Sequence, residues 1–173
     1  MPLPPIELEN IQVRINVIRF ALMRILLEVQ KLMEKKPRRE LLYEQARLWL
    51  GRDVSPLDLV NDDLGCAESV SCVIAKVTPF PIITGTASLV EYLKKSTRFL
   101  PVYGNVQRGD IIISPTGSGN GRIRGHVGIF GENETIMSND SLTGLWAQNF
   151  TTEKWFARYS VSGELKTYFF TLL

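Results

Sequence analysis

A repeat of apolar residues near the N-terminus constrains the fold most strongly, because its spacing fits only a helix. Successive members are four or three residues apart: Ile11, Ile15, Ile18, Leu22, Ile25, Val29 and Leu32. These steps place all of them on one side of an α-helix, as the a and d positions of a heptad repeat. Further apolar residues widen that side, at Val13, Val17, Phe20 and Leu27. We predict one long N-terminal helix that packs against more than one neighbour.

The same pattern limits what this helix can do. Charged residues interrupt the apolar stretch, and each costs about 2.5 to 3.5 kcal/mol near the centre of a bilayer, so no transmembrane span is expected. They are Arg14, Arg19, Arg24 and Glu28. Packing of the helix on its own domain is the first expectation. Self-association or a partner helix through Ile11–Leu32, and binding at a membrane surface, stay open as alternatives.

The rest of the chain changes from helical to strand-like patterns. A basic joint, Lys35–Arg39, precedes a helix over Arg39–Leu50, and Gly51 ends it. Helical spacing of apolar residues then indicates helices over Cys66–Val77 and Thr86–Lys95. The expected strands are Asp110–Ser114, His126–Phe130, Thr135–Ser138, Phe156–Val161 and Lys166–Leu172. Helices followed by antiparallel strands predict an α+β fold, with a helical segment over 1–50 and a second domain over 51–173.

Charge and composition exclude several kinds of partner. Twenty Lys and Arg against 18 Asp and Glu leave a net charge of only +2, so no nucleic-acid partner is expected. Cys66 and Cys72 are six residues apart, about 9 Å along a helix, which is too far for a disulfide. With a single histidine, neither a metal site nor another cofactor is expected.

The N-terminus lacks the basic patch and apolar run of a Sec signal peptide. We expect synthesis in the cytoplasm, with a holin pore, a virion or a secretion system as the open routes of export.

Cys66 is the first candidate for chemistry, because it begins a buried helix. The helix N-terminus favours negative charge, which lowers the pKa of a thiol there and supplies N–H donors for an oxyanion. Asp62 and Asp63 are expected to cap this helix from the preceding turn. The alternative is that Cys66, like Cys72, is a small buried residue.

His126 is the second candidate, because a thiol nucleophile needs a base and this is the chain's only histidine. It opens a strand directly after the glycine-rich loop 116–125, which we interpret as a mobile rim. A third polar group must hold the ring through its other nitrogen. Asn139, at the end of the next strand, is the candidate for that role, with Asp140 in reserve and an ordinary turn position for Asn139 as the alternative.

Two further groups are expected to be structural. Asp110 begins a strand at a turn. The aromatic residues of the last third, Trp146, Trp155, Phe156 and Tyr159, are expected to pack in the core rather than to bind sugar or peptide.

Three segments together resemble a known family. Gly65-Cys66-Ala67-Glu68-Ser69-Val70 is similar to the nucleophile helix of the NlpC-type and CHAP-type cell-wall cysteine hydrolases. The segment 106–113, Val-Gln-Arg-Gly-Asp-Ile-Ile-Ile, resembles their Gly-Asp strand, and 125–130, Gly-His-Val-Gly-Ile-Phe, resembles their histidine strand. The resemblance covers about Leu48 to Tyr168, and the compact chain without a signal is typical of a phage lysin.

The resemblance implies a papain-like fold and hydrolysis of amide bonds in peptidoglycan: within the peptide stem, in a cross-link, or between stem and sugar. Carried over to this chain, Cys66 attacks the carbonyl and forms an acyl-enzyme, His126 is base and then acid, and Asn139 orients His126. Three other functions remain open: a papain-like acyltransferase, a hydrolase of other amides, and a non-catalytic wall-binding or assembly protein that oligomerises through its N-terminal helix.

Overall fold

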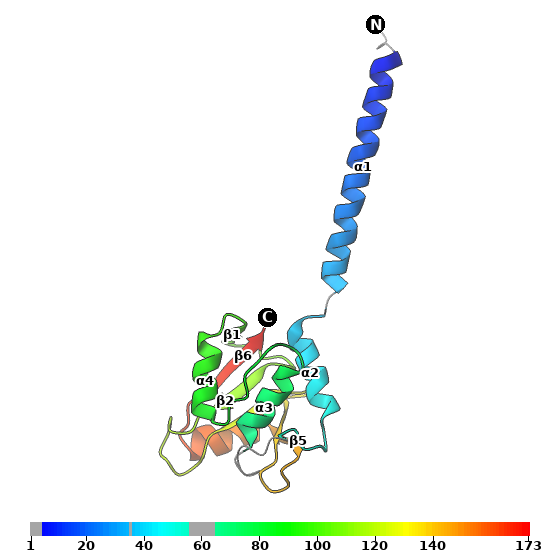
Figure 1. Ribbon diagram of the computed structural model, residues 1–173. Helices are drawn as coiled ribbons and strands as arrows, with labels where there is room; N and C mark the ends of the chain where they lie inside the picture. Colours follow the sequence, from blue (N-terminus) through cyan, green and yellow to red (C-terminus); the bar gives the residue numbers. More distant parts are fainter. Residues whose placement is uncertain (1–4, 35, 56–64) are drawn as a thin grey trace. The chain divides into compact units, whose positions relative to one another are not determined.

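The chain divides into two compact units, Met1–Lys36 and Pro37–Leu173. The computed structural model describes residues 5–34, 36–55 and 65–173 (Figure 1). The second unit thus begins at Pro37 rather than at residue 51, where we predicted the boundary. The reason is that helix α2, Arg38–Leu48, buries Leu42, Tyr43 and Ala46 in the core of the second unit.

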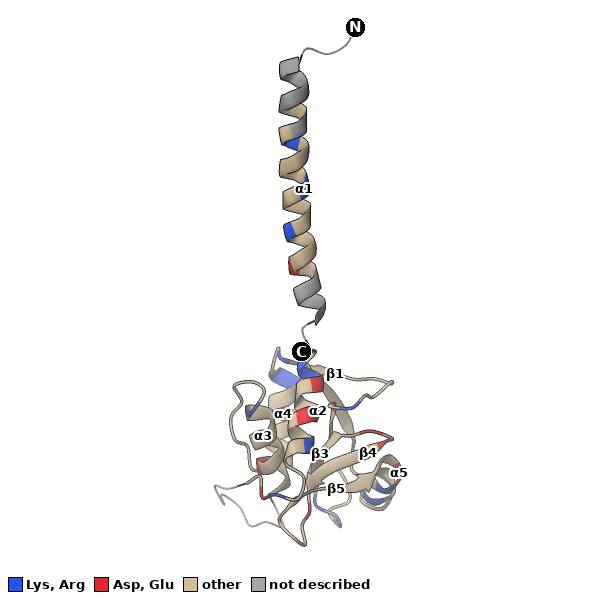
Figure 2. Ribbon diagram, turned by 90° about the vertical axis from the view of Figure 1, so that its right-hand side faces the viewer, with Lys and Arg blue, Asp and Glu red and all other residues tan. Residues whose placement is uncertain are grey.

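The first unit is the predicted long helix, α1, which runs over Pro5–Glu34. Its large apolar side chains between residues 11 and 29 are exposed, from 39% for Ile15 to 70% for Phe20. Charged residues take up only a few of the described positions along it (Figure 2). Among the described helices, none combines the length and the hydropathy that a membrane span requires.

The second unit is built on one antiparallel sheet of six strands in the order β1-β6-β2-β3-β4-β5. The strands are β1 Phe99–Pro101, β2 Ile111–Ser114, β3 His126–Phe130, β4 Thr135–Asn139, β5 Trp146–Thr151 and β6 Tyr168–Leu172. The α+β prediction is confirmed, and the bounds of β3 are those predicted.

One predicted strand is wrong, because Phe156–Val161 is helical. The short helix α5, Thr152–Trp155, continues directly into the π-helical segment η2, Phe156–Ser162. The apolar and aromatic residues of this segment suit a strand, but burial of Trp155 and Tyr159, four residues apart, needs one side of a helix. Strands β1 and β5 were not predicted.

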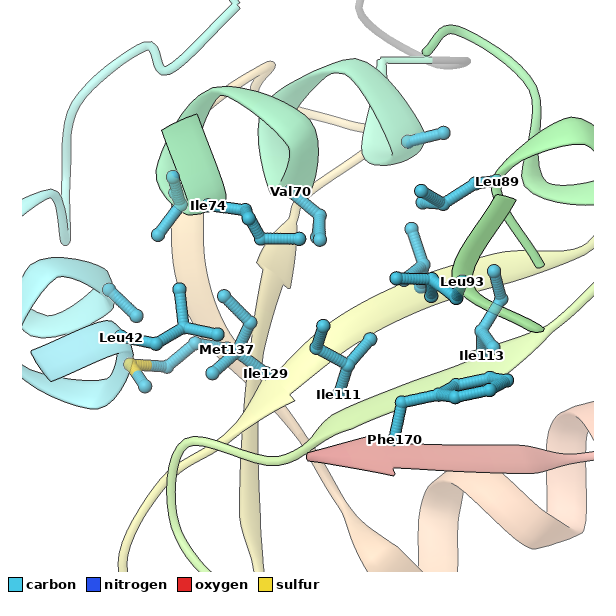
Figure 3. Close-up of a cluster of buried hydrophobic side chains, with 14 of the residues drawn as sticks. Leu42, Val70, Ile74, Leu89, Leu93, Ile111, Ile113, Ile129, Met137 and Phe170 are labelled. Carbon is cyan, nitrogen blue, oxygen red and sulfur yellow. The ribbon is translucent and has the colours of Figure 1, made fainter. Parts of the chain in front are cut away.

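Three helices cover one face of the sheet: α2, α3 (Cys66–Ala75) and α4 (Thr86–Lys95) (Figure 1). Their apolar side chains meet alternate residues of the strands in the main core. Figure 3 shows Val70 and Ile74 of α3 and Leu89 and Leu93 of α4 directed toward Ile111 of β2. Neither cysteine of α3 forms a disulfide.

The opposite face of the sheet carries a second, smaller core under α5 and η2. Its buried members are Ile112, Phe130, Ile136, Trp155, Tyr159 and Leu165. Trp155 and Tyr159 are buried here and Trp146 is buried in the main core, as predicted, whereas Phe156 is only half-buried. Side chains of β2, β3 and β4 therefore alternate between two cores.

The turn before β2 confirms a structural role for Asp110. Its carboxylate accepts a hydrogen bond from the backbone N–H of Gln107 at 2.8 Å and is almost fully buried. Gly109 beside it has φ +84°, and a Cβ there would collide with the backbone carbonyl of Arg39. The Gly-Asp pair thus allows the turn to approach the start of α2 closely.

Candidate active site

Cys66 occupies the first turn of α3 in the main core and is 8% exposed. Burial raises the pKa of its thiol to about 11, although hydrogen bonds from the backbones of Val127, Ala67 and Cys66 itself lower it. We predicted a lowered pKa from the helix N-terminus. The shift has the opposite sign because removal of the thiolate from water outweighs the N–H donors. The thiol is therefore protonated at neutral pH.

The predicted caps of this helix, Asp62 and Asp63, lie outside the described residues. Gly65 is the N-cap position of α3, and it has no side chain with which to cap the helix. The carbonyl of Gly65 accepts the N–H of Ser69 at 2.8 Å, which closes the first turn. Among the described residues, a backbone hydrogen bond therefore closes the start of α3.

His126 is the first residue of β3, and its ring is held by a chain of hydrogen bonds. Its Nε2 lies 2.9 Å from Ser138 Oγ, and that hydroxyl donates to Asn149 Oδ1 at 2.7 Å. Because the one hydroxyl proton of Ser138 goes to Asn149, Nε2 must carry the proton that it donates to Ser138. The other ring nitrogen, Nδ1, is then free of a proton and can accept one, as a general base requires.

Aromatic side chains surround the same ring. Tyr159 stacks on it with centroids 5.6 Å apart and an interplanar angle of 17°. Trp155 and Phe150 lie at 5.4 and 5.6 Å. Burial lowers the pKa of His126 to about 4, with a further lowering by the charge of Arg158 and a partial offset by Asp140. The imidazole is neutral at pH 7.

Asn139, the predicted orienting residue, lies on the other face of the sheet from Ser138. It pairs in register with Trp146, which belongs to the main core. Since side chains alternate along β4, Ser138 shares the face of His126 and Asn139 does not. The contact that we predicted for Asn139 is made by Ser138, with Asn149 behind it. Asp140, the reserve candidate, accepts the backbone N–H of Leu142 at 2.8 Å and so closes a turn.

The thiol and the imidazole lie on opposite faces of the sheet: Cys66 belongs to the main core, whereas the His126 ring packs on Trp155 and Tyr159 of the second core. The sulfur receives a hydrogen bond from the backbone of Val127, the residue next to His126. Burial raises the pKa of Tyr159, the charge of Arg158 lowers it, and a thiolate at Cys66 would raise it further. Among the described side chains, no hydrogen bond joins Cys66 to His126.

A cavity of about 550 Å³ opens beside the histidine. His126, Asn139 and Asp140 line it together with Tyr159. The loop 116–125 forms part of its wall and is tied down: Asn120 donates its backbone N–H to Gly163 at 3.1 Å, and Ser118 Oγ accepts from Lys166 at 3.2 Å. In the described part of the chain, no cluster of three His, Cys, Asp or Glu residues could hold a metal ion.

Sequence reasoning missed Ser138 and Asn149. The missing signal is strand register: Phe130 pairs with Ile136, so residues of even number on β3 and β4 share one face. Counting outward from that pair places Ser138 opposite Gly128, diagonally next to His126 on the same face. Asn149 had no such signal, because its strand was not predicted.

The burial of His126 predicts loss of stability in acid. Its pKa is about 6.5 unfolded and about 4 folded, so between these values the unfolded chain binds a proton that the native one does not. Stabilisation is therefore complete above pH 6.5 and is lost as the pH falls to 4, by about 3 kcal/mol.

Urea unfolding at pH 7 and pH 4 measures this loss. His126→Phe keeps a ring among the aromatic side chains and removes the titration. Between pH 7 and pH 4, the free energy of unfolding of this variant should therefore decrease by about 3 kcal/mol less than that of the unmodified protein. Equal losses in both proteins would show that His126 is already protonated, or exposed, in the native state.

Comparisons with known proteins support the fold. No protein-family model matches the chain, and no curated protein matches it. A chain in the crystal structure of the type VI native effector–immunity complex Tae3–Tai3 from Ralstonia pickettii is similar, with a TM-score of 0.51 and 14% sequence identity. The match covers 76% of this chain and 96% of that one. The likeness supports the α+β fold of the second unit.

Proposed function

We propose that this protein is a cysteine-dependent hydrolase that cleaves amide bonds in peptidoglycan. The observation that supports the proposal is the placement of Cys66 at the first turn of α3, which packs on the strand that begins with His126, whose Nδ1 is left as a proton acceptor. The three motifs shared with cell-wall cysteine hydrolases support it. So does the likeness in fold to a chain of an effector–immunity complex.

The mechanism starts from a neutral thiol and a neutral imidazole, because the pKa of Cys66 lies well above that of His126. Cys66 Sγ attacks the carbonyl carbon while Nδ1 of His126 takes the thiol proton. N–H groups at the first turn of α3 stabilise the oxyanion. His126 then gives its proton to the leaving amine, and water hydrolyses the acyl-enzyme.

Ser138 and Asn149 have a positioning role in this scheme. They hold Nε2 protonated, and the amide oxygen of Asn149 stabilises the positive charge that develops on the ring. Because the imidazole lies on the opposite face of the sheet from the thiol in this structure, the scheme requires the His126 side chain to turn toward Cys66 when substrate binds.

One observation favours a different function. A buried thiol with a raised pKa is what a small structural cysteine would also show. In that case the domain would bind wall fragments or assemble without cleaving them. A papain-like acyltransferase would share Cys66 and His126 and would differ only in using an amine in place of water.

Mass spectrometry of fragments released from purified sacculi tests the proposal. We expect new fragments that carry a free amine and a free carboxylate where one amide bond was, and the masses identify that bond. Transfer of the acyl group to an added amine would indicate the acyltransferase. Intact sacculi from several wall types, in the presence of folded protein, would contradict the proposal.

We also propose that α1 pairs with α1 of a second copy. In water, an apolar helix of this length packs against another apolar surface. The exposed heptad seam of Ile15, Ile18, Leu22 and Ile25 can pack against the same seam of a second copy. Arg14 and Glu28 occupy g positions near opposite ends of the seam. Antiparallel pairing places Arg14 of one helix beside Glu28 of the other, whereas parallel pairing would place Arg14 beside Arg19 of the other helix.

A further inference from the structure

The cavity beside His126 is lined by three arginines from two separate segments. Arg122 and Arg124 come from the loop before β3, and Arg158 comes from η2. The only carboxylate among its described lining residues is Asp140. Excess positive charge around a concave site attracts an anionic ligand.

Two of these arginines, Arg122 and Arg158, have no carboxylate partner among the described residues. Asp140 Oδ1 is engaged by the backbone N–H groups of Leu142 and Thr143, at 2.8 and 3.2 Å. Arg158 lies over the Tyr159 ring at 5.7 Å, so an exposed guanidinium is held at the wall of the cavity.

Arg158 lines the same cavity as His126, the proposed catalytic base. The charge of Arg158 is felt at the His126 ring, where it disfavours protonation. A ligand bound to Arg158 would therefore lie beside the His126 ring, which lines the same cavity. Guanidinium groups bind carboxylates in a two-pronged geometry that a lysine does not reproduce.

We propose that Arg122 and Arg158 bind a carboxylate of the substrate next to the bond that is cleaved. This inference rests on the proposed function and narrows it: the substrate is an amide flanked by a free carboxylate, as in an acidic peptide stem, rather than a neutral or amidated one. The same guanidinium groups could hold a phosphate of a wall polymer, but the amide chemistry of Cys66 and His126 favours the carboxylate.

Cleavage of two matched substrates tests the proposal. The first is a pool of soluble muropeptides from lysozyme-digested sacculi. The second is the same pool with its carboxylates converted to amides by carbodiimide and ammonia. We expect amidation to lower kcat/KM by about 10- to 100-fold, the value of a charged hydrogen bond. Arg122→Gln and Arg158→Gln should lower cleavage of the acidic pool by a similar factor and barely affect the amidated pool.

Arg38→Gln is the matched control, because Arg38 is an exposed arginine of α2 that does not line the cavity. It should leave cleavage of both pools unchanged. Equal cleavage of the two pools by the unmodified protein would overturn the carboxylate assignment and leave the hydrolase standing. Equal losses of cleavage on both pools in the Arg122 and Arg158 variants would also overturn the assignment. A loss of cleavage after hydrofluoric acid has removed phosphate from the wall would overturn it as well.

A binding measurement separates the two proposals. Calorimetric titration of Cys66→Ala with the acidic pool measures binding to the cavity without turnover. Binding that both arginine substitutions weaken, without cleavage by the unmodified protein, would refute the hydrolase and retain the carboxylate site. Absence of such binding would overturn the site.

Discussion

Replacement of Cys66 by alanine is expected to lower the rate of fragment release from sacculi by at least about a thousandfold. The acyl-enzyme cannot form without the sulfur, and the remaining N–H donors of α3 cannot replace a nucleophile. The measurement is the initial rate of new amine ends, with the mass of each product confirmed. The fold should survive, because the substitution removes one atom from a helix start held by backbone hydrogen bonds.

Cys72→Ala is the matched control for that experiment. Cys72 lies on the same helix, is half-buried, and has a pKa that burial also raises. Loss of this sulfur should leave the rate within about twofold of the unmodified protein. Full activity of Cys66→Ala would exclude catalysis by this thiol.

Substitution of both Ile18 and Ile25 by aspartate is expected to dissociate the proposed dimer of α1 helices. Each pair of variant chains loses four isoleucines from the seam, and each buried isoleucine contributes about 1.5 to 3 kcal/mol. The dissociation constant should rise by at least about 10⁴-fold. Light scattering over a range of concentrations should show a dimer for the unmodified protein and a monomer for the variant.

Phe20→Asp is the control, since residue 20 is at the outer f position of the heptad. Phe20 is the most exposed of the large apolar side chains of α1. A pair of helices should tolerate the change, whereas a bundle of several helices or a membrane-bound helix would not. A monomer at every concentration of the unmodified protein would exclude self-association and favour packing on the second unit.

Local patterns were sufficient for much of the fold. The 3.6-residue period of apolar positions predicted α1, and it predicted α4 with its observed bounds of Thr86 and Lys95. The apolar run from His126 to Phe130 predicted β3, because a short buried strand is apolar on both faces. Strand β1 has three residues, one of them Pro101, and carries too little pattern to be recognised.

Other elements depend on contacts that no local pattern contains. Strand β5 pairs its first residue, Trp146, with Asn139, and the indole N–H of Trp146 donates to the carbonyl of Ala46 in α2 at 2.9 Å. That contact joins residues a hundred positions apart. The segment after Trp155 has residues typical of a strand, but the second core requires it to be helical.

The sequence by itself determined which groups could react: one histidine, and a cysteine at the start of a helix. It also determined that the N-terminus is helical, because heptad spacing has no other solution. The tertiary structure decided that Ser138 rather than Asn139 holds the His126 ring, and that the pKa of Cys66 is raised rather than lowered. Both outcomes depend on which face of the sheet a side chain occupies and how much protein covers it. Strand register and long-range packing set these properties, and residue type does not.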